Sequence, residues 1–160
     1  MRVARARAAA GAALLLALAC SSMACPSSTG TPQSDAGGTP AGQPRSFRRD
    51  VVPIFAQSCA AQECHGDPEN TLGVHFVTSD PDGIYAELQH ESPTAKGARF
   101  VVPGDPTKSF LYAKVNGDEG DYADMCAMPG CGETMPPGTK IPSAQRDAIR
   151  QWIVEGATND

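Results

Sequence analysis

Two cysteines and a histidine lie close together in the segment Ser58–Asp67, in the order Cys59, Cys64, His65. In covalent haem attachment, two thiols add to the vinyl groups of the porphyrin. A histidine directly after the second cysteine then supplies an imidazole nitrogen to the iron. The usual spacing is C-x-x-C-H, whereas this chain has the wider spacing C-x4-C-H, whose extra residues can bulge out. The pattern predicts that Cys59 and Cys64 tether a haem and that His65 is its proximal ligand.

A second cysteine pair, Cys126 and Cys131, has the same spacing but is followed by Gly132, which cannot ligate iron. We predict a disulfide for this pair, because exported proteins meet oxidising conditions. Zinc is an alternative to haem, because thiolates and imidazole are common zinc ligands. Oxidising conditions oppose zinc thiolates, however, and the spacing of Cys59 and Cys64 is longer than the C-x2-C of a zinc knuckle.

Further short motifs accompany the cysteines in a fixed order along the chain. They are the segments 50–55 (Asp-Val-Val-Pro-Ile-Phe), 102–106 (Val-Pro-Gly-Asp-Pro), 109–114 (Ser-Phe-Leu-Tyr-Ala-Lys), 135–138 (Met-Pro-Pro-Gly) and 151–157 (Gln-Trp-Ile-Val-Glu-Gly-Ala). Together they resemble c-type cytochrome domains, particularly the planctomycete-type branch, over about residues 47–157. The resemblance implies a small all-α, class I cytochrome c-like bundle. It also implies one covalent haem c per chain and transfer of single electrons.

The resemblance further implies that Met135 is the distal iron ligand. Met135 precedes Pro136-Pro137-Gly138, a stiff turn suited to holding a thioether over the iron. Thioether sulfur favours the ferrous state, so His/Met ligation raises the reduction potential. The other candidates for this position are Met128, Met125, His75 and His90.

Composition limits the size of the core and the class of partner. The chain has 160 residues, of which 41% are hydrophobic and 6% aromatic, so an additional anchor such as a porphyrin or a disulfide is expected. The first 19 residues contain three of the 13 basic residues, which leaves ten basic against 18 acidic residues and a net charge of −8. This charge disfavours nucleic acid and anionic membrane surfaces as partners. It suits a basic redox partner protein, although it also serves solubility.

The beginning of the chain predicts export. Residues 1–19 have a basic start and an apolar run that is too short to span a bilayer, which is typical of a signal peptide. Cys20 directly follows Ala19 and favours lipoprotein processing, with ordinary cleavage after Ala19 or Ala24 as the alternative. Residues 20–45, which include Cys25, are rich in Ser, Gly and Pro and predict a disordered tether. We expect a protein of the periplasm or the outer cell surface, attached to a membrane through a lipid anchor only.

Residues 46–160 are expected to fold as about four short helices joined by Pro/Gly-rich loops. Asp50 is predicted to cap the first helix, which ends near Ser58 and delivers Cys59 to the site. The predicted caps of the other three helices are Ser79 or Asp80 before Pro81, Asp105 before Pro106, and Ser143. Gly117 and Gly156 are predicted to end the third and fourth helices. A short extended piece is expected over residues 72–76.

No catalytic constellation stands out in the sequence. The acidic run 118–124 does not fit a calcium-binding loop and predicts a solvated loop. Two alternatives to an electron carrier remain. One is a haem-free surface lipoprotein module that binds another protein and is stapled by disulfides, including one between Cys59 and Cys64. The other is a peroxidase-like haem protein, which requires that no side chain ligates the iron distally.

Overall fold

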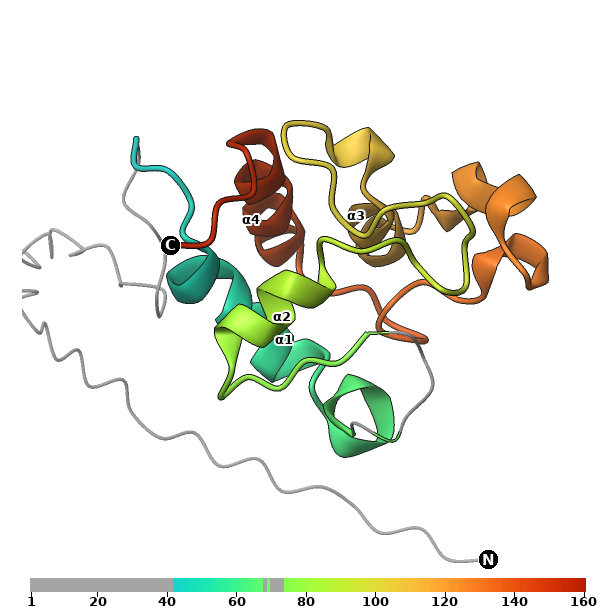
Figure 1. The fold of residues 1–160 in the computed structure, drawn as a ribbon, viewed down its shortest axis with the longest axis horizontal. Helices are drawn as coiled ribbons and strands as arrows, with labels where there is room; N and C mark the ends of the chain where they lie inside the picture. The colour runs from blue at the N-terminus through green and yellow to red at the C-terminus, as the bar shows by residue number, and fades with distance from the viewer. Residues whose placement is uncertain (1–41, 68, 70–73) are drawn as a thin grey trace, which may run out of the picture. The chain divides into compact units, whose positions relative to one another are not determined.

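The computed structural model describes residues 42–67, 69 and 74–160. The predicted signal peptide, Cys20, Cys25 and nearly all of the predicted tether lie outside these residues. The described part contains helices and no β-strand (Figure 1), which confirms the all-α class. The four α-helices are α1 (Val52–Ser58), α2 (Pro81–Glu87), α3 (Phe110–Asn116) and α4 (Ser143–Val154).

The first helical segment begins earlier than predicted, with a π-helical turn, η1 (Phe47–Val51), that runs directly into α1. Ser46 caps this turn by accepting a hydrogen bond from the Arg49 N–H at 3.2 Å. The backbone N–H of Ser46 in turn donates to the Asp50 carboxylate at 2.7 Å. The prediction that Asp50 is the cap is therefore wrong. Pro53 has no N–H to donate within the helix, and the change from π to α hydrogen bonding occurs beside it.

The predicted third helix is split in two. Asp105 caps only a 3-10 turn, η3 (Pro106–Lys108), and Ser109 then takes an extended conformation before α3 begins. The Ser109 hydroxyl donates to the Asp105 carbonyl at 2.8 Å and accepts from the Val102 N–H at 2.9 Å. These two bonds satisfy the buried Ser109 hydroxyl while its backbone stays extended. The chain therefore does not form one continuous helix here, and that prediction is wrong. The end of α3 at Gly117, which has a φ of +84°, is as predicted.

The other predicted helix ends agree with the structure in part. Of the two predicted caps of α2, Asp80 is the one that caps it, by accepting from the Gly83 N–H at 3.0 Å. Ser143 does not cap α4: it is the first helical residue, and Pro142 before it stands at the cap position. Gly156 follows the end of α4 with a φ of +105°, as predicted.

Two short 3-10 helices, η4 (Glu119–Met125) and η5 (Pro129–Cys131), lie at one extremity of the described domain, drawn in orange in Figure 1. The acidic run is therefore mostly helical and the loop prediction is wrong, whereas Asp118, Asp121 and Asp124 are exposed, as predicted. The expected extended piece at 72–76 lies partly outside the described residues, and residues 74–76 are not in a strand. No helix in the described ranges has the length and apolar character needed to cross a membrane.

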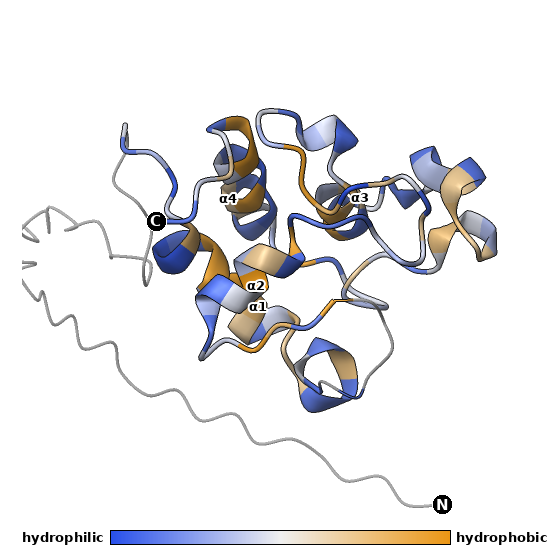
Figure 2. Ribbon diagram, in the orientation of Figure 1, coloured by the Kyte–Doolittle hydropathy of each residue, from blue (hydrophilic) through white to orange (hydrophobic). Residues whose placement is uncertain are grey.

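The core joins the two ends of the domain. Trp152 of α4 is fully buried and stacks on Phe47 with ring centroids 5.1 Å apart. Its Nε1–H donates to the Thr158 carbonyl at 2.9 Å. Phe55 of α1 is also fully buried. Hydrophobic residues accordingly occur along α1, α3 and α4 (Figure 2).

We expect Trp152→Ala to lower the free energy of unfolding by about 3–5 kcal/mol, because it removes a fully buried indole and leaves a cavity. Val154→Ala is a matched control in the same helix, since the Val154 side chain is 40% exposed; it should change stability by less than about 0.5 kcal/mol. Chemical denaturation measures both values. Similar losses in the two variants would contradict this description of the core.

Candidate functional site

An apolar cavity of about 330 Å³ lies beside the cysteine–histidine motif. Its apolar walls come mainly from Val74, Phe76, Phe100 and α3. Cys59, His65 and Met135 also line it. A second cavity of about 110 Å³ shares these three residues and adds Cys64. The structure thus brings the four predicted haem-binding residues to the walls of two neighbouring cavities.

The widened motif folds back on itself within a short π-helical turn, η2 (Gln62–Gly66). The backbone N–H of His65 donates to the Cys59 carbonyl at 3.1 Å, so the histidine returns to the end of α1 despite the additional residues. Gly66 completes the turn by donating its N–H to the Ala61 carbonyl at 3.0 Å. A Cβ atom at Gly66 would lie 2.3 Å from the Ala60 carbonyl oxygen, so only glycine fits this position.

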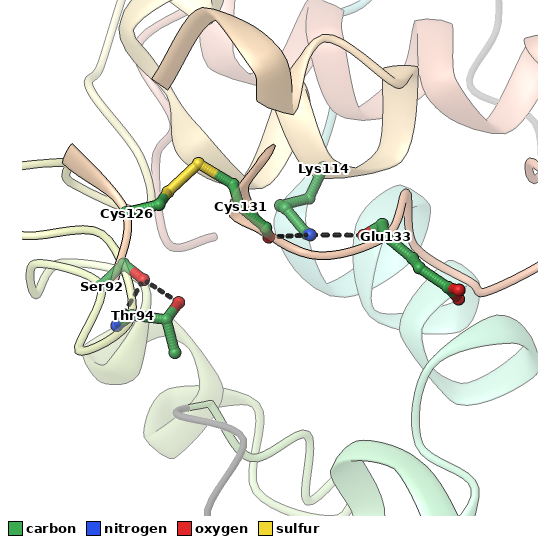
Figure 3. Close-up of a disulfide and its surroundings, with 6 residues drawn as sticks. All are labelled: Ser92, Thr94, Lys114, Cys126, Cys131 and Glu133. Atoms are coloured by element: carbon green, nitrogen blue, oxygen red, sulfur yellow. Dashed lines mark hydrogen bonds between the residues drawn. A yellow bond between two sulfur atoms is a disulfide. The ribbon is translucent and has the colours of Figure 1, made fainter. Parts of the chain in front are cut away.

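The two cysteine pairs differ in the structure. Cys126 and Cys131 form a disulfide, with Cα atoms 5.1 Å apart (Figure 3). Cys59 and Cys64 are not joined in a disulfide. Burial, together with the charge that Cys64 can carry nearby, raises the pKa of the Cys59 thiol to about 12, so this thiol is protonated. The described residues contain no group of three or more His, Cys, Asp or Glu that could hold a metal ion.

The ring of His65 has the tautomer and the protonation state that a metal ligand needs. Its Nδ1 lies 2.9 Å from the Val74 carbonyl oxygen. Because a carbonyl can only accept, Nδ1 carries the hydrogen and Nε2 keeps its lone pair. Burial lowers the pKa of His65 by more than the hydrogen bond to Val74 raises it. His75 and Lys114 nearby add to the lowering, so the neutral imidazole is favoured. The ring of Phe76 packs edge-on against it, with centroids 5.4 Å apart.

Met135 is held by α3 through its own backbone and through the loop 131–134 that precedes it. The N–H of Met135 donates to the Lys114 carbonyl at 2.8 Å. The Lys114 ammonium donates to the carbonyl of Cys131 at 2.9 Å and also to the carbonyl of Glu133 (Figure 3). The disulfide fixes the start of the same loop.

Lys114 is the site residue that sequence reasoning missed. It is half-buried at the cavity wall, and desolvation lowers its pKa. Its binding partners are main-chain carbonyls, which carry no signal in the sequence. The segment 109–114 contains Lys114, but that motif alone does not predict what the ammonium binds.

The other candidates for the distal position are placed differently. Met128 lines the larger cavity, but 55% of it is exposed. Met125 is 47% exposed and lines neither cavity. His75 and His90 do not line either cavity. Met135 lines both, which makes it the best placed of the five.

The chemistry of this donor set fits a haem: two thiols, a neutral imidazole and a thioether gather around an apolar space. No protein-family model, no curated protein and no solved structure matches the chain. The assignment of function therefore depends on the motif and on the geometry of the cavity.

We expect Lys114→Met to lower the free energy of unfolding by about 1–3 kcal/mol, because two main-chain carbonyls lose a charged donor. Lys96→Met is the matched control, since the Lys96 side chain is exposed; its effect should stay below about 0.5 kcal/mol. Hydrogen exchange should also show faster exchange of the Met135 amide in the Lys114 variant alone. Unchanged exchange at Met135 would contradict the role given to Lys114.

Proposed function

We propose that the protein is an exported, monohaem c-type cytochrome-like electron carrier. Cys59 and Cys64 hold one haem c covalently, His65 ligates the iron proximally, and Met135 ligates it distally. The observation that carries the proposal is the position of His65: its Nδ1 is engaged by Val74, while its ring lines the same apolar cavity as Cys59 and Met135. The finer fold assignment, a class I cytochrome c-like bundle, belongs to the same proposal.

A haem bound in this site would exchange single electrons as its iron cycles between Fe(III) and Fe(II). The residues of the chain have supporting roles. The carbonyl of Val74 keeps the imidazole of His65 in one tautomer and orientation. The apolar walls exclude water, which together with a methionine ligand raises the reduction potential. Lys114 holds the loop that carries Met135.

The location and partner are part of the proposal. Cys20 is lipidated and ties the protein to a membrane, with the domain in the periplasm or at the outer cell surface. The partner is a redox protein, and the net charge of −8 in residues 20–160 favours a basic one. The alternative proposal is a haem-free surface module stapled by disulfides. Cys126 and Cys131 are joined in a disulfide, whereas Cys59 and Cys64 are not.

Haem staining of a denaturing gel tests the function. Protein matured in a periplasm should carry haem at its own mass, and Cys59→Ser/Cys64→Ser should abolish the stain, because thioether bonds alone survive denaturation. Cys126→Ser/Cys131→Ser has the same change in composition and should keep the stain. If the wild-type protein did not stain for haem, the electron-carrier proposal would be wrong.

Replacing the distal ligand should change the iron site without releasing the haem. Met135→Ala should lower the reduction potential and admit small ligands such as cyanide, because it opens the sixth coordination position. Met128→Ala is the matched control and should leave both properties unchanged. Potentiometry and ligand titration measure the two effects. If the control variant opened the site instead, Met128 would be the ligand.

A further inference from the structure

The described residues expose four large hydrophobic side chains, and two of them, Met125 and Met128, belong to the disulfide-linked segment around η4 and η5. Met128 is 55% exposed and also lines the larger cavity. It therefore forms part of both the outer surface and the cavity wall. Exposed methionines are common at binding surfaces, because the thioether side chain adapts to different partners.

Four exposed carboxylates belong to the same segment: Asp118, Asp121, Asp124 and Glu133. Within the described ranges, none of the four forms an ion pair with Lys, Arg or His. Lys96 contributes a cation beside them, because its backbone N–H donates to the Met125 carbonyl at 2.8 Å. Lys114 supplies a second cation, because its ammonium donates to the Cys131 and Glu133 carbonyls. Residues 118–133 nevertheless contain five acidic residues and no Lys or Arg. We call Asp118, Asp121, Asp124, Met125, Met128 and Glu133 the docking face.

The backbone of the docking face is fixed from two sides. The disulfide closes the segment between Cys126 and Cys131. On the other side, the Ala127 N–H donates to the Thr94 carbonyl at 3.0 Å, and Cys126 forms an isolated β-bridge with Ala95. A surface that is already ordered loses little conformational entropy on binding. The segment projects at one extremity of the domain, away from α4 (Figure 1).

We propose that the docking face binds a basic electron-carrier protein, with an apolar centre on Met125 and Met128 and a lysine- or arginine-rich rim opposite the four carboxylates. This inference rests on the proposed function. A redox partner would dock beside Met128 because Met128 lines the cavity in which the proposed haem would lie. An apolar centre with a charged rim is the usual anatomy of protein interfaces. Rim charges mainly set the rate and the salt dependence of association.

Zero-length carbodiimide cross-linking tests the proposal on the full mature protein in detergent. The probe is a lysine-rich cytochrome c of the mitochondrial class, at low ionic strength. The carbodiimide joins carboxylates to lysines in contact, so mass spectrometry should find cross-links at the docking face. Cross-links concentrated on other carboxylates, or no binding at all, would overturn the proposal.

Calorimetry with matched variants supplies the second measurement. Asp121→Asn/Asp124→Asn should weaken binding roughly three- to tenfold. The control Asp147→Asn/Glu155→Gln removes the same charge from exposed positions at and just after α4 and should change the affinity less than twofold. Met128→Ser should weaken binding without any change in charge, and Lys96→Gln should strengthen it. If both double variants weakened binding equally, the loss of affinity would come from net charge alone. That result would overturn the proposal that the docking face binds the partner.

The outcomes separate this inference from the proposed function. Haem staining of the same sample reports the haem independently of binding. A stained protein that fails to bind through these residues would overturn the docking face alone. An unstained protein that still binds through them would overturn the electron carrier and leave a surface for protein binding.

Discussion

The hydrogen bond between the His65 ring and the Val74 carbonyl is the interaction on which the candidate site depends. It selects the tautomer in which Nε2 is available to a metal, and it fixes the ring at the cavity wall. The turn η2 makes this bond possible, because the His65 N–H reaches back to the Cys59 carbonyl. Gly66 is required by the same turn, since a side chain there would collide with Ala60. A motif with two additional residues can thus present its histidine next to the first cysteine.

The opposite wall depends on α3. Met135 lies far from His65 in the sequence, and it reaches the same cavity because its loop bonds to Lys114 at three points. A charged donor in a partly desolvated position holds carbonyls more strongly than a solvated one. The disulfide fixes the beginning of this loop, so the second cysteine pair serves the site without belonging to it.

Local signals in the sequence predicted local features well. Asp80 before Pro81 marked the start of α2, and glycines marked the ends of α3 and α4, because capping involves residues close together in the chain. Prediction failed where a polar side chain accepts a hydrogen bond from a backbone N–H several residues earlier in the chain. Ser46 rather than Asp50 caps the first helical segment, as Asp50 is buried and bonds back to it. Ser109 interrupts the third helix because its hydroxyl bonds to Val102 outside the helix. Lys114 could not be found from sequence, since its partners are main-chain atoms brought near by folding.

The most direct test of the account is the chemical state of Cys59 and Cys64 in protein matured in a periplasm. Mass spectrometry of the proteolytic peptide that contains Cys59, Cys64 and His65 measures it without reference to activity. The account predicts that the peptide carries one haem, joined to both sulfur atoms. A peptide without haem, with the two cysteines either joined in a disulfide or present as free thiols, would contradict the account.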